Sequence, residues 1–134
     1  MNQFKLVIVE NDEDERFFMN EAFQESEEFQ ILGAFENGDT LIEWLDQTNA
    51  SDQPEIILSD LNMPGKNGYD ILTHVQAHPE YAHITVIITS TSTVVSIREK
   101  CLSLGAKDYL VKPEIFIDYS DYVKNLYQLV SQHK

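Results

Sequence analysis

Four short segments of this chain are apolar at nearly every position, and polar residues follow each one at once. A strand with one face in water alternates apolar and polar residues, so an unbroken apolar run indicates a strand that is covered on both faces. Such strands are typical of a parallel sheet between layers of helices. The four runs cover residues 6–9, 56–58, 84–88 and 109–111.

The segments between these runs show helical spacing, apart from a further strand predicted at residues 29–35, where apolar and polar residues alternate. Asn11 or Asp12 is expected to cap a helix that continues through about Ser26. Two pairs of residues four apart predict its inward stripe: Phe18 with Ala22, and Met19 with Phe23.

The later helices are predicted from the same spacing. Gly105 is expected to end the helix after the third run, residues 84–88, as a left-handed cap, and Cys101 is expected to be a buried thiol on that helix. The residues expected to line it are Val94, Ile97, Cys101 and Leu104, and those expected to line the last helix are Tyr119, Tyr122, Val123, Leu126 and Val130. The aromatic surface of the last helix leaves open whether part of it is a partner site.

Five strands alternating with five helices predict one doubly wound α/β domain over residues 1–134, with its core at about 4–131. In such sheets the functional crevice lies beyond the carboxyl ends of the strands. Those ends carry the chemistry of this sequence, in Glu10 with Asn11, Asp60, Ser90 and Lys112.

These groups fit phosphoryl transfer. The Asp60 carboxylate could attack phosphorus and form an acyl phosphate. Lys112 and Ser90 could offset the negative charge of the transferred group with an ammonium and a hydroxyl donor. Glu10 beside Asp60 could hold Mg²⁺, which prefers carboxylate oxygens and retained water.

Over about residues 4 to 131 the chain resembles the receiver domains of two-component response regulators. Asp60 precedes Ser90 by 30 residues, and Lys112 follows after 22 more. The resemblance implies a CheY-like, stand-alone domain with a flavodoxin-like fold. The matching motifs are VIVEND at 7–12, LSDLNMPGKNG at 58–68, VIITS at 86–90 and GAKDYLVKP at 105–113.

The resemblance implies that Asp60 is the phosphoacceptor and that Lys112 binds the phosphoryl group. The bond from Lys112 to Pro113 would be cis, as is common in the family and cheapest before proline. Ser90 and Tyr109 would form the switch, with Tyr109 turning inward on phosphorylation. The alternative for Tyr109 is an ordinary core aromatic.

The resemblance also implies a metal site. Its ligands would be Glu10, Asp60 and the backbone carbonyl of Asn62. Asn11 stands where the family usually has an aspartate that ligates the metal, so weak Mg²⁺ binding is expected. Asp12 is a further candidate ligand, whereas the acidic run 12–15 otherwise reads as a solvated first helical turn. The histidines at 74, 78, 83 and 133 show no metal spacing and are interpreted as surface residues.

A formal charge of −14 argues against nucleic-acid and anionic-membrane partners. The chain shows neither a signal-peptide pattern nor a membrane-span pattern, so we expect a cytoplasmic location. The expected partners are a sensor histidine kinase or histidine phosphotransfer protein and a downstream protein. The domain would catalyse only its own phosphorylation and dephosphorylation.

Two other functions are weighed against this one. Asn11 leaves room for a phosphorylation-independent pseudo-receiver that acts only through protein contacts. Asp60-x-Asn62 faintly resembles the motif of aspartyl-phosphate phosphohydrolases, which need an acid at the second position and a late acidic metal pair.

Overall fold

Five parallel strands form one sheet in the computed structural model, which describes residues 3–113 and 119–132. The strands lie in the order β2-β1-β3-β4-β5, and every neighbouring pair is parallel. Their bounds are β1 Phe4–Val9, β2 Phe29–Phe35, β3 Ile56–Asp60, β4 Thr85–Ser90 and β5 Asp108–Val111. The predicted doubly wound, flavodoxin-like α/β fold is confirmed.

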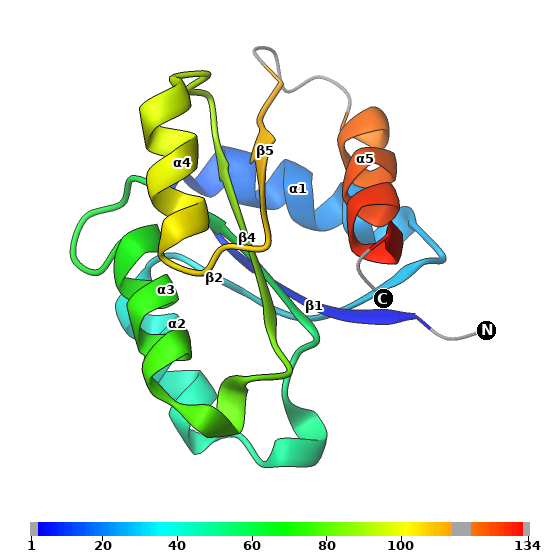
Figure 1. Ribbon diagram of the computed structural model, residues 1–134. Helices are drawn as coiled ribbons and strands as arrows, with labels where there is room; N and C mark the ends of the chain where they lie inside the picture. The colour runs from blue at the N-terminus through cyan, green and yellow to red at the C-terminus, as the bar shows by residue number, and fades with distance from the viewer. Residues whose placement is uncertain (1–2, 114–118, 133–134) are drawn as a thin grey trace.

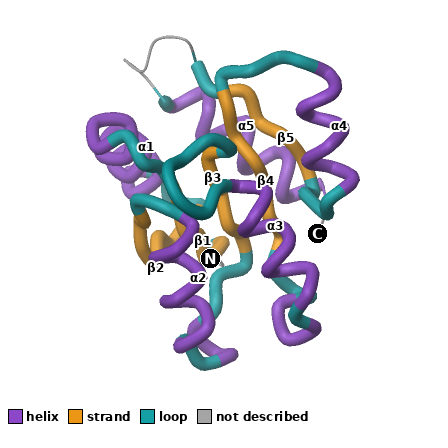
Figure 2. Tube along the Cα trace, turned by 90° about the vertical axis from the view of Figure 1, so that its left-hand side faces the viewer, coloured by secondary structure: helices purple, strands orange, loops and turns teal. Residues whose placement is uncertain are grey.

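Helices cover both faces of this sheet, as Figures 1 and 2 show. Alternate residues of β1 point to opposite faces, so Leu6 and Ile8 pack toward α1 and α5 while Val7 and Val9 pack toward α2, α3 and α4. The helices are α1 Glu13–Glu25, α2 Gly38–Gln47, α3 Gly68–Ala77, α4 Val95–Ser103 and α5 Ser120–Gln132, with short 3₁₀ turns at Ala50–Asp52 and Pro79–Tyr81.

Polar residues begin the helices that flank the site. Asp12, one of the two predicted caps, accepts a hydrogen bond from the Glu15 N–H at 2.9 Å and so begins α1. Asn67 and Asp70 form a reciprocal capping box at the start of α3. Gly105 follows α4 with a φ of +108°, which confirms the predicted left-handed cap.

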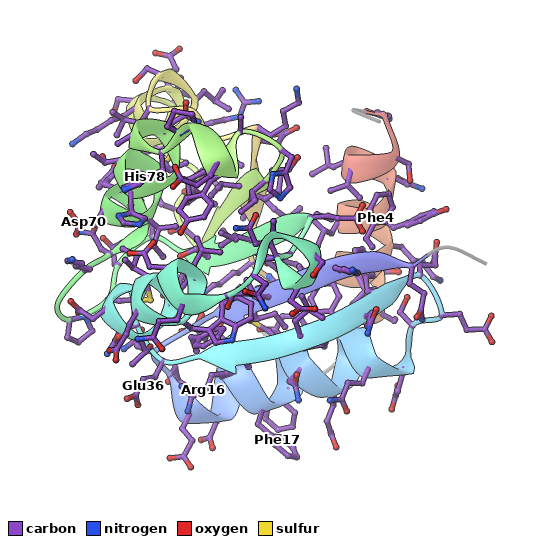
Figure 3. The ribbon with its side chains drawn as sticks, turned by 90° about the horizontal axis from the view of Figure 1, so that it is seen from below. Phe4, Arg16, Phe17, Glu36, Asp70 and His78 are labelled. Carbon is purple, nitrogen blue, oxygen red and sulfur yellow. The ribbon has the colours of Figure 1, made fainter. Side chains whose placement is uncertain are left out.

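Two predicted core positions are wrong. Phe18 is 41% exposed, because the buried line of α1 runs through Met19 and Phe23, and consecutive helical residues point about 100° apart. Its neighbour Phe17 points outward from α1 in Figure 3 and stacks edge-on against Phe18. Val94 is the cap residue before α4 and is 52% exposed, so it precedes the helical face that it was expected to line.

The aromatic residues of the last segment are mainly core. Tyr119 and Tyr122 are buried, and Tyr127 is half-buried against Phe4 and Phe29. Cys101 is buried, as expected. None of the helices in the described ranges combines the length and the apolar character that a membrane span requires.

Candidate functional site

The carboxyl ends of the strands bring the predicted site residues to one edge of the sheet. Glu10 follows β1, Asp60 ends β3, Ser90 ends β4 and Lys112 follows β5. β3 lies between β1 and β4, so Asp60 has an acid-bearing strand on one side and a hydroxyl-bearing strand on the other. All four residues are buried, although all four residue types usually lie at the surface.

Lys112 lies among three carboxylates. Its Nζ is 2.5 Å from Glu10 Oε1 and 3.2 Å from Asp60 Oδ1. The third carboxylate is Glu15, in the first turn of α1, whose Oε1 lies 3.1 Å from the same nitrogen. The contact with Glu10 is also a hydrogen bond, in which the ammonium donates.

Burial sets the protonation of this cluster. Loss of hydration raises the pKa of Asp60 and of Glu10, and the nearby charge of Lys112 offsets part of that rise. Desolvation alone would lower the pKa of Lys112, but the charge of Asp60 and the hydrogen bond to Glu10 outweigh it and raise that pKa. Lys112 is therefore a fixed positive charge at neutral pH.

Backbone groups hold the acids in place. Asp60 Oδ1 accepts a hydrogen bond from the Leu61 N–H at 2.9 Å, and Glu10 Oε2 accepts one from the Asp12 N–H at 3.0 Å. Arg16 donates to the Glu10 carbonyl oxygen at 2.7 Å.

In Figure 3 Arg16 lies at the same end of the molecule as Glu36, the residue after β2.

Ser90 and Tyr109 both connect to the loop after β4. The Ser90 Oγ accepts a hydrogen bond from the Ser92 N–H at 3.2 Å, and the Tyr109 hydroxyl donates to the Ser92 carbonyl at 2.8 Å. Tyr109 is buried against the core, so its ring already lies inward. Tyr109 therefore lies in the core and also contacts the loop after β4.

The other expected metal ligands are not buried in the cluster around Lys112. Asn11 and Asn62 are exposed, and Asp12 uses one carboxylate oxygen to cap α1. Within the described ranges, no three acidic, histidine or cysteine side chains are grouped as a metal cage. The donor chemistry nevertheless fits Mg²⁺, because three carboxylates face one ammonium and leave the cleft with excess negative charge.

Sequence reasoning missed Glu15, which was assigned to a solvated helical turn. Its contact with Lys112 depends on how α1 packs across the sheet, and acids in a first helical turn are too common to signal it. Tyr119 also reaches the site, since its hydroxyl donates to Glu15 Oε1 at 3.3 Å.

Two further expectations need correction. His74 and His78 are not simple surface residues: their rings stack 4.2 Å apart, and His74 contacts Asp46 at 2.9 Å. His133 lies outside the described residues. Among the described peptide bonds none is cis, so the bond from Lys112 to Pro113 is trans, unlike the one that the resemblance implied.

Comparison with known proteins identifies the family. The sequence matches the family model of the response regulator receiver domain over residues 6–123. The chain therefore belongs to the receiver domain family of two-component response regulators. Receiver domains act as signalling switches and are generally not enzymes.

One curated relative is the two-component response regulator ORR12 of rice, Oryza sativa subsp. japonica. It is 43% identical over 63 residues, which cover 47% of this chain and 52% of that protein. The chain thus spans about half the length of this relative, as it does for the rice regulator ORR8, where the match covers 53%.

Solved structures share the fold at lower identity. The phosphorylated cyanobacterial phytochrome response regulator RcpA superposes with a TM-score of 0.83 at 22% identity, covering 99% of this chain and 97% of that one. The Mn²⁺-bound form of response regulator Rcp1 gives a TM-score of 0.77 at 22% identity, with coverages of 92% and 91%.

Proposed function

We propose that this receiver domain accepts a phosphoryl group on Asp60 and changes its protein contacts in response. The observation that carries the proposal is the buried contact of 3.2 Å between Asp60 Oδ1 and Lys112 Nζ. A carboxylate nucleophile beside a permanent cation, at the carboxyl edge of a parallel sheet, is suited to a dianionic group. The RcpA neighbour, whose structure is of the phosphorylated protein, has the same fold.

In the proposed reaction an Asp60 carboxylate oxygen forms a bond to phosphorus. The bond from phosphorus to the nitrogen of a donor histidine breaks, and its electron pair stays on the imidazole, which takes up a proton. Lys112 donates to a phosphoryl oxygen, and the Ser90 hydroxyl donates to another. The group is removed by hydrolysis: water attacks phosphorus, the bond from phosphorus to the Asp60 oxygen breaks, and the Asp60 carboxylate and inorganic phosphate are released.

Receiver domains in general bind Mg²⁺, and the Rcp1 neighbour is a Mn²⁺-bound form. In this chain we assign the metal to Glu10, Asp60 and the Asn62 carbonyl. A bound divalent cation would supply positive charge opposite Lys112. Asn11 contributes a neutral amide where the family usually offers a carboxylate, so we propose that the affinity is low.

We propose that Ser90 and Tyr109 transmit the change. When the Ser90 hydroxyl turns to a phosphoryl oxygen, the hydrogen bond it accepts from the Ser92 N–H is lost. The Tyr109 hydroxyl donates a hydrogen bond to the Ser92 carbonyl. Ser90 and Tyr109 therefore contact the same loop residue, and we expect both contacts to change together. Because Tyr109 is already buried, we expect a change in its hydrogen bond in place of an inward turn.

The proposed donors are a sensor histidine kinase or a histidine phosphotransfer protein, and the readout is a downstream protein. Receiver domains interact with histidine kinases and effectors, which gives this chain its class of partner. The strong negative charge of the chain favours protein partners over nucleic acid.

The test is incubation with Mg²⁺ and acetyl phosphate, followed by intact mass measurement. The wild-type chain should gain one phosphoryl group, and Asp60→Asn should gain none while keeping its fold. Asp52→Asn, an exposed acid in the turn before β3, is the matched control and should behave as wild type. A folded wild-type chain that stays unmodified would favour the phosphorylation-independent function that Asn11 suggests.

A further inference from the structure

Glu15 comes from helix α1, whereas Glu10 follows β1 and Asp60 ends β3, and the reaction proposed above does not use Glu15. Its Oε1 forms an ion pair with the Lys112 ammonium at 3.1 Å and accepts a hydrogen bond from the Tyr119 hydroxyl at 3.3 Å. Tyr119 is buried, and it lies one residue before α5. Glu15 therefore joins the buried lysine to the start of the last helix.

Lys112 Nζ donates a hydrogen bond to Glu10 and lies 3.1 Å from a Glu15 oxygen and 3.2 Å from an Asp60 oxygen, so three carboxylates already compete for its charge. A phosphoryl oxygen on Asp60 would have to compete with them. Glu10 is almost fully buried and is held by the Asp12 N–H, so it cannot readily leave. The Glu15 side chain is 16% exposed at the mouth of the site, so it can turn toward water.

We propose that Glu15 is a positioning residue that competes with the phosphoryl group for Lys112, and that Tyr119 holds it in the competing position. Its negative charge also opposes the approach of an anionic phosphodonor. When Lys112 turns to the phosphoryl group, Glu15 swings outward and the Tyr119 hydroxyl loses its acceptor. The backbone oxygen of Tyr119 accepts a hydrogen bond from the Val123 N–H at 2.9 Å. A shift of Tyr119 therefore alters the first turn of α5.

This inference rests on the proposed function, and the rate of Asp60 phosphorylation tests it. With acetyl phosphate and saturating Mg²⁺, Glu15→Gln should be modified about 3- to 10-fold faster than wild type, equivalent to about 0.7–1.4 kcal/mol at ~1.4 kcal/mol per decade. Glu13→Gln is the matched control. It removes the same charge from the same helical turn at an exposed position, and its rate should stay within about twofold of wild type.

A double-mutant cycle tests the role of Tyr119. Tyr119→Phe should raise the rate in the native background, because Glu15 is then held less firmly. It should have no effect in the Glu15→Gln background, where the neutral side chain no longer competes for Lys112. Thermal unfolding of each variant shows that the fold is retained, and amide shifts of residues 119–126 on adding beryllofluoride report the change at α5.

Some outcomes would overturn the inference alone. These are a Glu15→Gln rate equal to that of Glu13→Gln, a rate below wild type at saturating Mg²⁺, or equal effects of Tyr119→Phe in both backgrounds. A wild-type chain that takes up no phosphoryl group overturns the proposed function itself, and that result is visible before any variant is compared.

Discussion

At the scale of single residues, the site is defined by one ammonium shared among three carboxylates. Lys112 compensates Glu10, Glu15 and Asp60 only in part, and two of these acids have a pKa that burial raises. An arrangement of this kind costs stability in the absence of a cation or phosphoryl ligand. These acids therefore do not stabilise the fold, and we explain their presence by the binding of a cation or a phosphoryl group.

This cost predicts that Asp60→Asn stabilises the protein. The raised pKa means that the folded state holds its proton more tightly than the unfolded state, so the ionised carboxylate is destabilising at neutral pH. The free energy of unfolding should rise by about 1 kcal/mol at pH 7. The difference from wild type should shrink as the pH falls through the raised pKa, as urea unfolding at several pH values would show.

Asp46→Asn is the control with the opposite sign. Desolvation would raise the pKa of Asp46, but hydrogen bonds from Tyr81 at 2.6 Å and His74 at 2.9 Å lower it overall. Its ionised form therefore stabilises the fold, and that stabilisation is lost as the pH falls. Asp46→Asn should lower the free energy of unfolding at pH 7. If both variants shifted stability in the same direction, this account of Asp60 would be wrong.

We predict that Asn11→Asp raises the affinity for Mg²⁺. Asn11→Asp adds a carboxylate beside Glu10, and two unit charges ~4 Å apart interact by about 1 kcal/mol in water and about 4 at an effective dielectric of 20. We expect Mg²⁺ to bind about 10- to 100-fold more tightly. Amide shifts during a Mg²⁺ titration measure this, and Asn20→Asp, further along α1, is the control for added charge. Equal dissociation constants for wild type and Asn11→Asp would place residue 11 outside the ligand set, or show that Asp12 already supplies the missing carboxylate.

The residues that sequence reasoning placed correctly are those at strand ends. Glu10, Asp60, Ser90 and Lys112 could be found because parallel strands bring their carboxyl ends to one edge whatever the helices do. Glu15 and Tyr119 could not, because their contact depends on the packing angle of α1 and on side-chain rotamers. His74 lies on α3 and His78 follows its last residue, but Asp46, the partner of His74, belongs to α2.

At the scale of elements, α5 is tied to the sheet through a buried hydroxyl pair. Tyr122 donates to Thr89 Oγ1 at 2.6 Å, and the Thr89 hydroxyl donates to the Leu110 carbonyl at 2.8 Å. Thr89 precedes Ser90 on β4, so α5, β4 and β5 meet beside the site. The strands themselves were predictable from unbroken apolar runs, whereas this polar link within the core was not, because it joins residues far apart in sequence.

Removing this hydrogen-bonded link should lower the free energy of unfolding, and by more for Thr89→Val than for Tyr122→Phe. Tyr122→Phe deletes one donor and leaves the Thr89 hydroxyl on Leu110, so it should cost about 0.5–1.5 kcal/mol. Thr89→Val leaves the Tyr122 hydroxyl and the Leu110 carbonyl without this partner, so it should cost about 1–3 kcal/mol. Thr73→Val, which removes an exposed hydroxyl on α3, is the control and should be close to neutral. Equal costs in the core and on α3 would contradict the link.

At the scale of the whole molecule, an acidic α/β domain presents one chemically distinct edge. The helices cover both faces of the sheet, so the carboxyl edge is where buried polar groups can meet a ligand (Figure 1). The central claim that remains to be tested is that Asp60 forms the acyl phosphate.

The most direct measurement is to locate the modified residue. After incubation with acetyl phosphate and Mg²⁺, borohydride reduces an aspartyl phosphate to homoserine, and peptide mass spectrometry then identifies the converted position. The account predicts homoserine at residue 60 in proportion to the phosphoryl group gained, and none in a sample without phosphodonor. Conversion at another acid, such as Glu10, Asp12 or Glu15, with residue 60 left as aspartate would contradict it.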